Sequence, residues 1–170
     1  MDSLVKNRAL ALVQMASAPQ SIRTFFVTSA TEGRRALLQS DRMAQLLLHV
    51  LENNRKKRRL LLHEFVIMPN HFHLLLTPNP VVPLEKALQF IKGGFSFRAK
   101  RELHWDLEIW QPSFVNHRIR DAEDYKQHRA YIWQNPVRAG LAESPELFPW
   151  SSAFVGVKMD AAPPGLKPKI

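Results

Sequence analysis

The 170-residue sequence contains no cysteine, so it can form neither a disulfide nor a thiolate metal site. The lack of cysteine suits a reducing compartment, and we expect a cytoplasmic protein. No uninterrupted apolar run is long enough to cross a membrane. The apolar patch at residues 9–15 is short for a signal sequence and is followed by a poor cleavage site, so we interpret residues 1–20 as an N-terminal arm.

Acidic residues are scarce relative to basic ones. The 24 lysines and arginines outnumber the 15 aspartates and glutamates, which gives a formal net charge of +9. Such a charge favours a polyanionic partner, most often nucleic acid. An acidic membrane surface is the alternative, but it requires a basic amphipathic helix or a lipidation signal, and the sequence shows neither clearly. We therefore expect a nucleic-acid partner and no membrane partner.

The hydrophobic content of 45% is sufficient for one domain with a sizeable core. Runs rich in strand-forming residues occupy residues 22–29, 60–68, 71–77 and 114–120, and helical spacing of apolar residues occupies 41–53 and 84–101. A last helix begins after Asp121, a good N-cap, and Pro136 should limit it because proline disfavours helical geometry in the residue before it.

The order of these elements is β-α-β-β-α-β followed by a helix. This order predicts an α+β fold with a ferredoxin-like antiparallel sheet and helices on one face. We place the domain at residues 21–157 and expect residues 158–170 to form a flexible tail.

A pair of histidines follows the sharpest turn signal in the chain, Pro69-Asn70. Because residues two apart in a strand face the same side, His71 and His73 should project together while Phe72 faces the opposite side. Two imidazoles on one rigid face can act as a pair of metal ligands. A chance pair of surface or half-buried histidines is the alternative, since short His-x-His patterns are common.

Tyr131 and Asn135 are four residues apart, so a helix places them on one face. A half-buried aromatic residue and a polar residue at a helix end are their ordinary interpretations. A tyrosine that attacks a phosphodiester needs a cation to polarise the phosphate. His71, His73 and the Asn135 side-chain oxygen would supply three ligands, and this mixed set suits Mn²⁺ or Mg²⁺, although imidazoles also bind Zn²⁺.

The chain contains one other tyrosine, Tyr125. It lies six residues before Tyr131 and therefore on a different helix face. The residue four positions after it is Arg129, which cannot bind a metal. Tyr131 is therefore the better candidate for a nucleophile beside a metal ion.

Basic residues cluster in two places, an unbroken run between a predicted helix and strand, and the end of the helix at 84–101. The solvated surface is one interpretation of such clusters, and contact with phosphates is the other. Given the net charge, we favour phosphate contacts for Arg55, Lys56, Lys57, Arg58, Arg59, Lys92, Arg98, Lys100 and Arg101. Trp105, Trp110 and Trp133 are candidates for stacking on bases, with core packing the better interpretation of each.

Several spaced motifs together resemble the single-tyrosine HUH transposases, and most closely the REP-associated tyrosine transposases. These motifs are Met68–Leu76, Ile109–Gln111, His117–Asp121 and Tyr131–Leu141, and the resemblance extends over about residues 22–152. It implies a ferredoxin-like fold and a divalent-metal-dependent nuclease that cuts and rejoins single-stranded DNA near imperfect hairpins. It also implies that His71 and His73 are the HUH pair, that Tyr131 on the C-terminal catalytic helix is the nucleophile, and that Asn135 completes the metal site.

From this resemblance we expect a transposase-type enzyme that uses Mg²⁺ or Mn²⁺ and forms a 5′-phosphotyrosine intermediate on single-stranded or hairpin DNA. It would act as a monomer or a homodimer. One alternative is a non-catalytic binder of hairpin DNA or RNA on the same fold, which would leave no covalent adduct. Another is an RRM-like RNA module, which needs exposed aromatic residues on its central strands and finds only a weak match in Phe25-Phe26.

Overall fold

The structure is a computed structural model that describes residues 22–168, so the expected N-terminal arm at 1–20 lies outside the described residues. The strands are β1 (Phe25–Ala30), β2 (Leu60–Met68), β3 (His71–Pro78) and β4 (Val115–Arg118). The helices are α2 (Asp41–Lys56), α3 (Leu84–Leu103) and α4 (Ala122–Arg138), with short 3₁₀ helices at Glu32–Arg34, Leu37–Gln39 and Pro145–Leu147. None of the helices in the described range is long and apolar enough to cross a bilayer.

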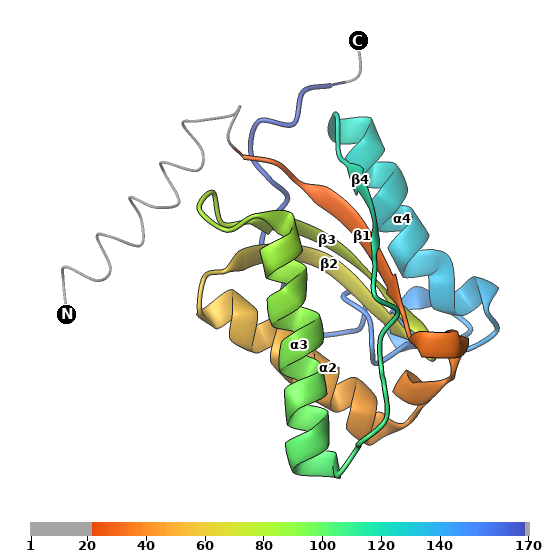
Figure 1. Ribbon diagram of the computed structural model, residues 1–170. Coiled ribbons are helices and arrows are strands. Elements are labelled where there is room, and N and C mark those ends of the chain that lie inside the picture. Colours follow the sequence, from red (N-terminus) through yellow and green to blue (C-terminus); the bar gives the residue numbers. More distant parts are fainter. Residues whose placement is uncertain (1–21, 169–170) are drawn as a thin grey trace.

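The strands form one sheet in the order β2-β3-β1-β4, and every neighbouring pair is antiparallel. The predicted ferredoxin-like order is thereby confirmed. Helices α2 and α3 cover one face of the sheet, and α4 covers the other (Figure 1). The two helices of the β-α-β-β-α-β unit therefore share a face, as expected, and the additional C-terminal helix closes the opposite one.

The side chains of β3 alternate between these two layers. Phe72, Leu74 and Leu76 are fully buried in the core beneath α2 and α3. Leu75 belongs to a second, smaller core with residues of α4. The period of two in a strand therefore sends His71 and His73, which share Leu75's side of the sheet, toward α4.

Helix α2 begins as its sequence predicts, because the Ser40 hydroxyl accepts a hydrogen bond from the Met43 amide at 3.2 Å. The helix continues to Lys56, past the expected end near Asn53. Its last turn therefore contains Arg55 and Lys56, and the basic run begins on the helix rather than in the following connection.

The prediction that Pro136 limits the last helix is wrong, because α4 continues through it to Arg138. Proline removes only its own amide donor, and near the end of a helix that loss affects a single bond. The end is closed instead by two backbone bonds, from the Ala139 amide to the Asn135 carbonyl and from the Leu141 amide to the Pro136 carbonyl.

The chain after α4 returns along the outer edge of β2. Residues 150–152 form backbone hydrogen bonds with this strand. The Asp160 amide then donates to the Leu62 carbonyl at 3.0 Å, and the Asp160 carboxylate accepts from the Leu62 amide at 2.8 Å and from Arg55 at 3.0 Å. These contacts cover an edge that would otherwise be free to pair, and they continue past residue 157, where the sequence places the end of the domain.

His63 on β2 is almost completely buried and connects this C-terminal segment to the sheet. Its Nδ1 donates to the Ala161 carbonyl at 2.6 Å, and its Nε2 lies 2.8 Å from the Thr77 hydroxyl, which lies 2.8 Å from the Thr24 hydroxyl. Burial lowers the pKa of His63 below its ordinary value. A neutral imidazole is therefore part of the folded state at neutral pH.

We predict that the free energy of unfolding decreases as the pH falls below about 6.5, the ordinary pKa of histidine. In that range the unfolded chain takes up a proton at residue 63 that the folded chain does not, so the unfolded state gains stability. His63→Gln should reduce this pH dependence by up to about 1.4 kcal/mol per pH unit, measured by urea unfolding between pH 7 and 5.

The matched control is His49→Gln, which removes an exposed imidazole from α2. It should leave the slope of unfolding free energy against pH as it is in the original protein. An equal slope in the His63→Gln protein and the original protein would contradict the role given to His63.

Candidate active site

His71 and His73 lie side by side on β3, facing α4. Their ring centroids are 4.7 Å apart with the planes at 75°. In the sheet, His73 pairs with Thr28 on β1 and Val66 on β2. Phe72 between them packs on the opposite face against Trp110. The hairpin and the shared face of the two histidines are as the sequence predicts.

Each of the two rings is oriented by a hydrogen bond that involves its Nδ1 atom. The Asn70 amide nitrogen faces the Arg34 carbonyl at 3.4 Å, so its oxygen faces His71 Nδ1 at 2.7 Å, and that nitrogen must carry the hydrogen. His73 Nδ1 lies 2.7 Å from the Thr28 hydroxyl. His73 Nε2 is buried and has no hydrogen-bond partner within residues 22–168. A buried ring nitrogen without a partner, on an imidazole whose other nitrogen is hydrogen-bonded, fits a metal ligand.

The electrostatics of the site keep both imidazoles neutral. Burial, the neighbouring His71 imidazole and the charge of Arg138 lower the pKa of His73 to about 3. Burial and the charge of Arg34 also lower the pKa of His71. Neutral imidazole is the form that binds a metal, so the pair is already in its ligating state at neutral pH.

Helix α4 brings Tyr131 to this pair. The Tyr131 ring centroid lies 5.3 Å from that of His73, nearly perpendicular to it. Phe26 on β1 stacks on His73 at 5.2 Å and meets the edge of Tyr131 at 5.9 Å. Tyr131 remains 42% exposed, so a substrate from solvent can reach its hydroxyl. Asn135 lies one turn later on α4 and is half-buried.

Tyr125 lies elsewhere, in the core between α4 and the sheet. It is 4% exposed, and its ring edge meets His63 at 6.2 Å. Burial, and the nearby charge of Glu64, raise the pKa of Tyr125 to about 12. A phenol that is buried and hard to deprotonate is a poor nucleophile, so the structure favours Tyr131 over Tyr125.

A buried carboxylate holds the middle of α4 against the sheet. Glu64 on β2 accepts hydrogen bonds from the Trp133 indole at 2.8 Å and the Ser152 hydroxyl at 2.5 Å. The Arg129 guanidinium lies over the other side of the indole, 5.2 Å from the ring. Trp133 is therefore engaged in anchoring the helix, and Trp110 is buried in the core with its indole donating to the Lys92 carbonyl at 3.0 Å.

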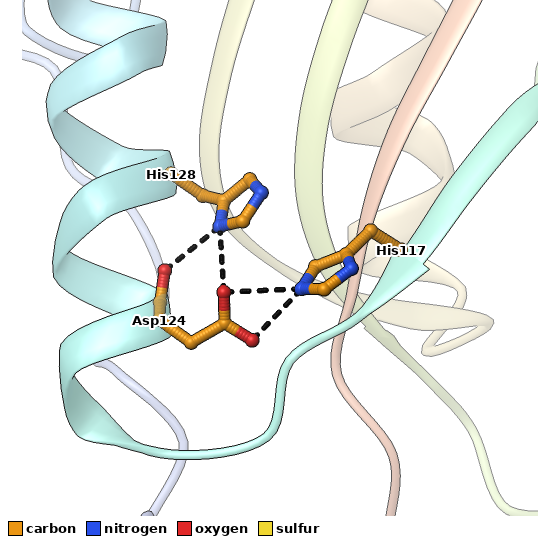
Figure 2. A group of neighbouring side chains, drawn as sticks. All are labelled: His117, Asp124 and His128. Atoms are coloured by element: carbon orange, nitrogen blue, oxygen red, sulfur yellow. Dashed lines mark hydrogen bonds and ion pairs between the residues drawn. The ribbon is translucent and has the colours of Figure 1, made fainter. Parts of the chain in front are cut away.

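The sequence reasoning missed a second group of ligand-type side chains, shown in Figure 2. His117 on β4 lies 2.8 Å from Asp124, and His128 one turn along α4 lies 3.1 Å from the same carboxylate. The two imidazoles stack at 4.7 Å. Three ligand atoms lie within 4.8 Å of one another, so the group could hold a metal ion. The signal available in the sequence was the spacing of Asp124 and His128, which a helix places on one face.

In this group, however, the imidazole N–H bonds point toward the oxygens of Asp124. A carboxylate only accepts, so the His117 nitrogen that faces Asp124 carries a hydrogen. His128 Nδ1 also donates to the Asp124 main-chain carbonyl at 2.8 Å. Burial opposes ionisation of Asp124, but hydrogen bonds from His117 and Arg120 outweigh it and lower the pKa of the carboxyl. The group therefore ties β4 to α4, while the His71–His73 pair is the one that presents a free lone pair.

Four of the nine candidate DNA-contacting cations are engaged in the fold. Arg55 pairs with Glu52 and Asp160, and Arg98 pairs with Glu102. Arg59 lies 3.8 Å over the Phe90 ring, and Lys92 donates to the carbonyls of Gln111 and Ser113. The remaining five are exposed: Lys56, Lys57, Arg58, Lys100 and Arg101.

The structure does not bring these cations to the histidines. The basic run precedes β2, whereas His71 pairs with Met68 at the other end of that strand. At about 3.3 Å per residue, the two ends are on the order of 25 Å apart. Lys57, Arg59 and Arg101 line a groove of about 520 Å³ between α2 and α3, on the face of the sheet opposite Tyr131.

Comparisons with known proteins agree on one family. The sequence model of the family described as "Transposase IS200 like" matches residues 23–135. The curated "REP-associated tyrosine transposase" of Escherichia coli K12 is 29% identical over 130 residues, which cover 76% of this chain and 75% of that protein. A solved structure described as a REP-associated tyrosine transposase bound to a REP hairpin has a TM-score of 0.65 and 26% identity, and the match covers 87% of this chain and 92% of that one.

We predict that one divalent ion binds at the His71–His73 pair. In a calorimetric titration with Mn²⁺, His73→Ala should weaken binding at least about 100-fold. Loss of a residue that only supports a metal ligand lowers metal affinity by up to about 100-fold, and loss of the ligand itself should cost no less. His128→Ala is the matched control, since it removes an imidazole from the other group on the same face of the sheet. Binding that survives in His73→Ala and is lost in His128→Ala would contradict this prediction, because it would place the metal at the group of His117, Asp124 and His128.

Proposed function

Because the chain belongs to the IS200-like transposase family, we propose that it is a metal-dependent nuclease and strand transferase that cuts and rejoins single-stranded DNA beside a hairpin. The observation that carries this proposal is the 5.3 Å approach of the exposed Tyr131 ring to His73. The names of the relatives support it: the curated relative is called a REP-associated tyrosine transposase, and the solved one is described with a bound REP hairpin.

We propose that His71 Nε2, His73 Nε2 and the Asn135 side-chain oxygen hold a divalent metal, Mg²⁺ or Mn²⁺. The partnerless His73 nitrogen supports this assignment. When bound, the ion would neutralise charge on a phosphate and orient it for attack. The hydrogen bonds that His71 Nδ1 forms with Asn70 and His73 Nδ1 forms with Thr28 would keep the two rings turned toward the ion.

The covalent step proposed for Tyr131 is an in-line exchange at phosphorus. A bond forms between the Tyr131 oxygen and phosphorus as the bond from phosphorus to the 3′ oxygen breaks. The phenol proton is released, and the departing 3′ oxygen takes up a proton to become a hydroxyl. The resulting 5′-phosphotyrosine preserves the phosphodiester energy, so a later 3′ hydroxyl can reverse the exchange and seal a strand.

Hairpin DNA is the partner that fits this chemistry and the net charge of +9. We propose that the exposed cations on the ends of α2 and α3 hold the duplex part of the hairpin at a distance from the single strand at Tyr131. We propose that the protein acts in the cytoplasm, as a monomer or a homodimer.

We predict that Tyr131→Phe abolishes strand cleavage and the covalent adduct while hairpin binding persists. The substitution removes one oxygen from an exposed ring and retains its packing against Phe26 and His73. The measurement is denaturing electrophoresis of protein incubated with Mn²⁺ and a labelled single-stranded oligonucleotide that contains a hairpin. A slower-migrating protein–DNA species is expected from the original protein alone.

Tyr125→Phe is the matched control and should keep both cleavage and adduct, although loss of a buried hydroxyl can change stability. An adduct that persists in Tyr131→Phe would exclude this residue as the nucleophile. Binding without any adduct in the original protein would instead favour a non-catalytic hairpin-binding protein.

A further inference from the structure

Two arginines stand beside the histidine pair without a carboxylate partner. The Arg138 guanidinium lies 4.5 Å over the Tyr131 ring and donates to the Tyr131 main-chain carbonyl at 3.3 Å. Within residues 22–168 it takes part in no ion pair. One bond to a carbonyl uses one of the five N–H donors of the guanidinium and leaves the others available.

Arg34 approaches His71 through its main chain. Its carbonyl accepts from the Asn70 amide, whose oxygen accepts from His71 Nδ1, so a chain of hydrogen bonds connects the two residues. The side chain of Arg34 is exposed and has no ion pair in the described range. Its φ of 51° lies in the left-handed region, which costs a residue other than glycine of order 1 kcal/mol or more.

The two arginines contrast with others in the protein. Arg55 and Arg98 are compensated by acidic side chains. Within residues 22–168, by contrast, no acidic side chain forms an ion pair with Arg34, or with Arg138 over the Tyr131 ring. A guanidinium without an acidic partner is available to an anionic ligand, and positive charge beside a candidate nucleophile attracts a phosphate.

We propose that Arg34 and Arg138 form a phosphate clamp, in which each guanidinium donates hydrogen bonds to oxygens of the DNA phosphodiester that Tyr131 attacks. This inference rests on the proposed function of the same site. The planar fork of a guanidinium matches two phosphate oxygens, and its charge would stabilise the negative charge that develops as the 3′ oxygen departs. Both arginines are therefore catalytic residues, since they touch the reacting group.

The test compares single-turnover cleavage of a hairpin-containing oligonucleotide, in Mn²⁺, by the original protein and by Arg34→Gln and Arg138→Gln. Each substitution should slow adduct formation about 100-fold, the usual cost of removing one donor to a transition-state oxygen. The matched control is Arg23→Gln, which also removes one exposed positive charge. Arg23 precedes the start of β1, whereas Ala30, the partner of His71, lies at the end of that strand. This control should change the cleavage rate less than about threefold.

The affinity for the oligonucleotide separates a catalytic role of the two arginines from a general contribution of their charge to DNA binding. Oligonucleotide binding, measured with Tyr131→Phe as the background, should weaken no more in the two clamp variants than in Arg23→Gln. Free guanidinium should restore part of the rate to Arg138→Ala, and Arg138→Lys should retain an intermediate rate with an unchanged melting temperature. Cleavage in both clamp variants within threefold of Arg23→Gln, or a loss explained entirely by weaker binding, would overturn the clamp.

Absence of an adduct in the original protein would reject the proposed function, and a second measurement would then test the phosphate clamp separately. If the original protein forms no adduct, inorganic phosphate is titrated and followed by the imidazole NMR signals of His71 and His73. Shifts that are present in the original protein and absent in the double Arg34→Gln, Arg138→Gln protein would support the clamp. Equal shifts, or none in either protein, would overturn it.

Discussion

The structure depends on one constraint, the burial of both faces of β3. As a central strand, β3 pairs with β1 on one side and β2 on the other, so its register is fixed by neighbours as well as by packing. Phe72 and Leu74 anchor one face beneath α2 and α3, and Leu75 anchors the other beneath α4. A slip of one residue would exchange the two faces and bury the histidines in the main core. The position of His71 and His73 is therefore a consequence of packing that does not involve them.

The second requirement is that α4 lie in one place on the sheet, and buried polar contacts supply it. Glu64 fixes the middle of the helix through Trp133, and Asp124 fixes its first turns through His117 on β4. Hydrogen bonds to charged groups contribute about 1.5–3 kcal/mol each, and they are directional in a way that apolar packing is not. Between these anchors lies Tyr131, and its approach to His73 follows from where the helix is held.

Protonation distinguishes two histidine groups that look alike as sets of ligands. At Asp124 the imidazole nitrogens that face the centre carry hydrogens, because a carboxylate and a carbonyl both need donors. At β3 the Nδ1 atoms are bonded to Asn70 and Thr28, and His73 Nε2 is buried without a hydrogen-bond partner among the described residues. The first group is thus suited to joining two elements and the second to binding a cation. The partners of the nitrogens, and not the spacing of the residues, make this difference.

The sequence by itself determined what depends on neighbours along the chain. The period of two in a strand placed His71 and His73 on one face, the Ser40 and Asp121 side chains began their helices, and the order of elements indicated the ferredoxin-like sheet. It failed at Pro136, where a local rule about proline was outweighed by the closing bonds at the helix end.

Only the tertiary structure decided which distant residues meet. It placed Tyr131 against His73 and Phe26, left Tyr125 in the core, and compensated Arg55 with Asp160 while leaving Arg138 beside Tyr131. Exposure and partnership are set by chain segments that are far apart in the sequence, and a local pattern carries no record of them. The charge of a residue is therefore known from the sequence, whereas the fold decides whether that charge is exposed and free to contact a ligand.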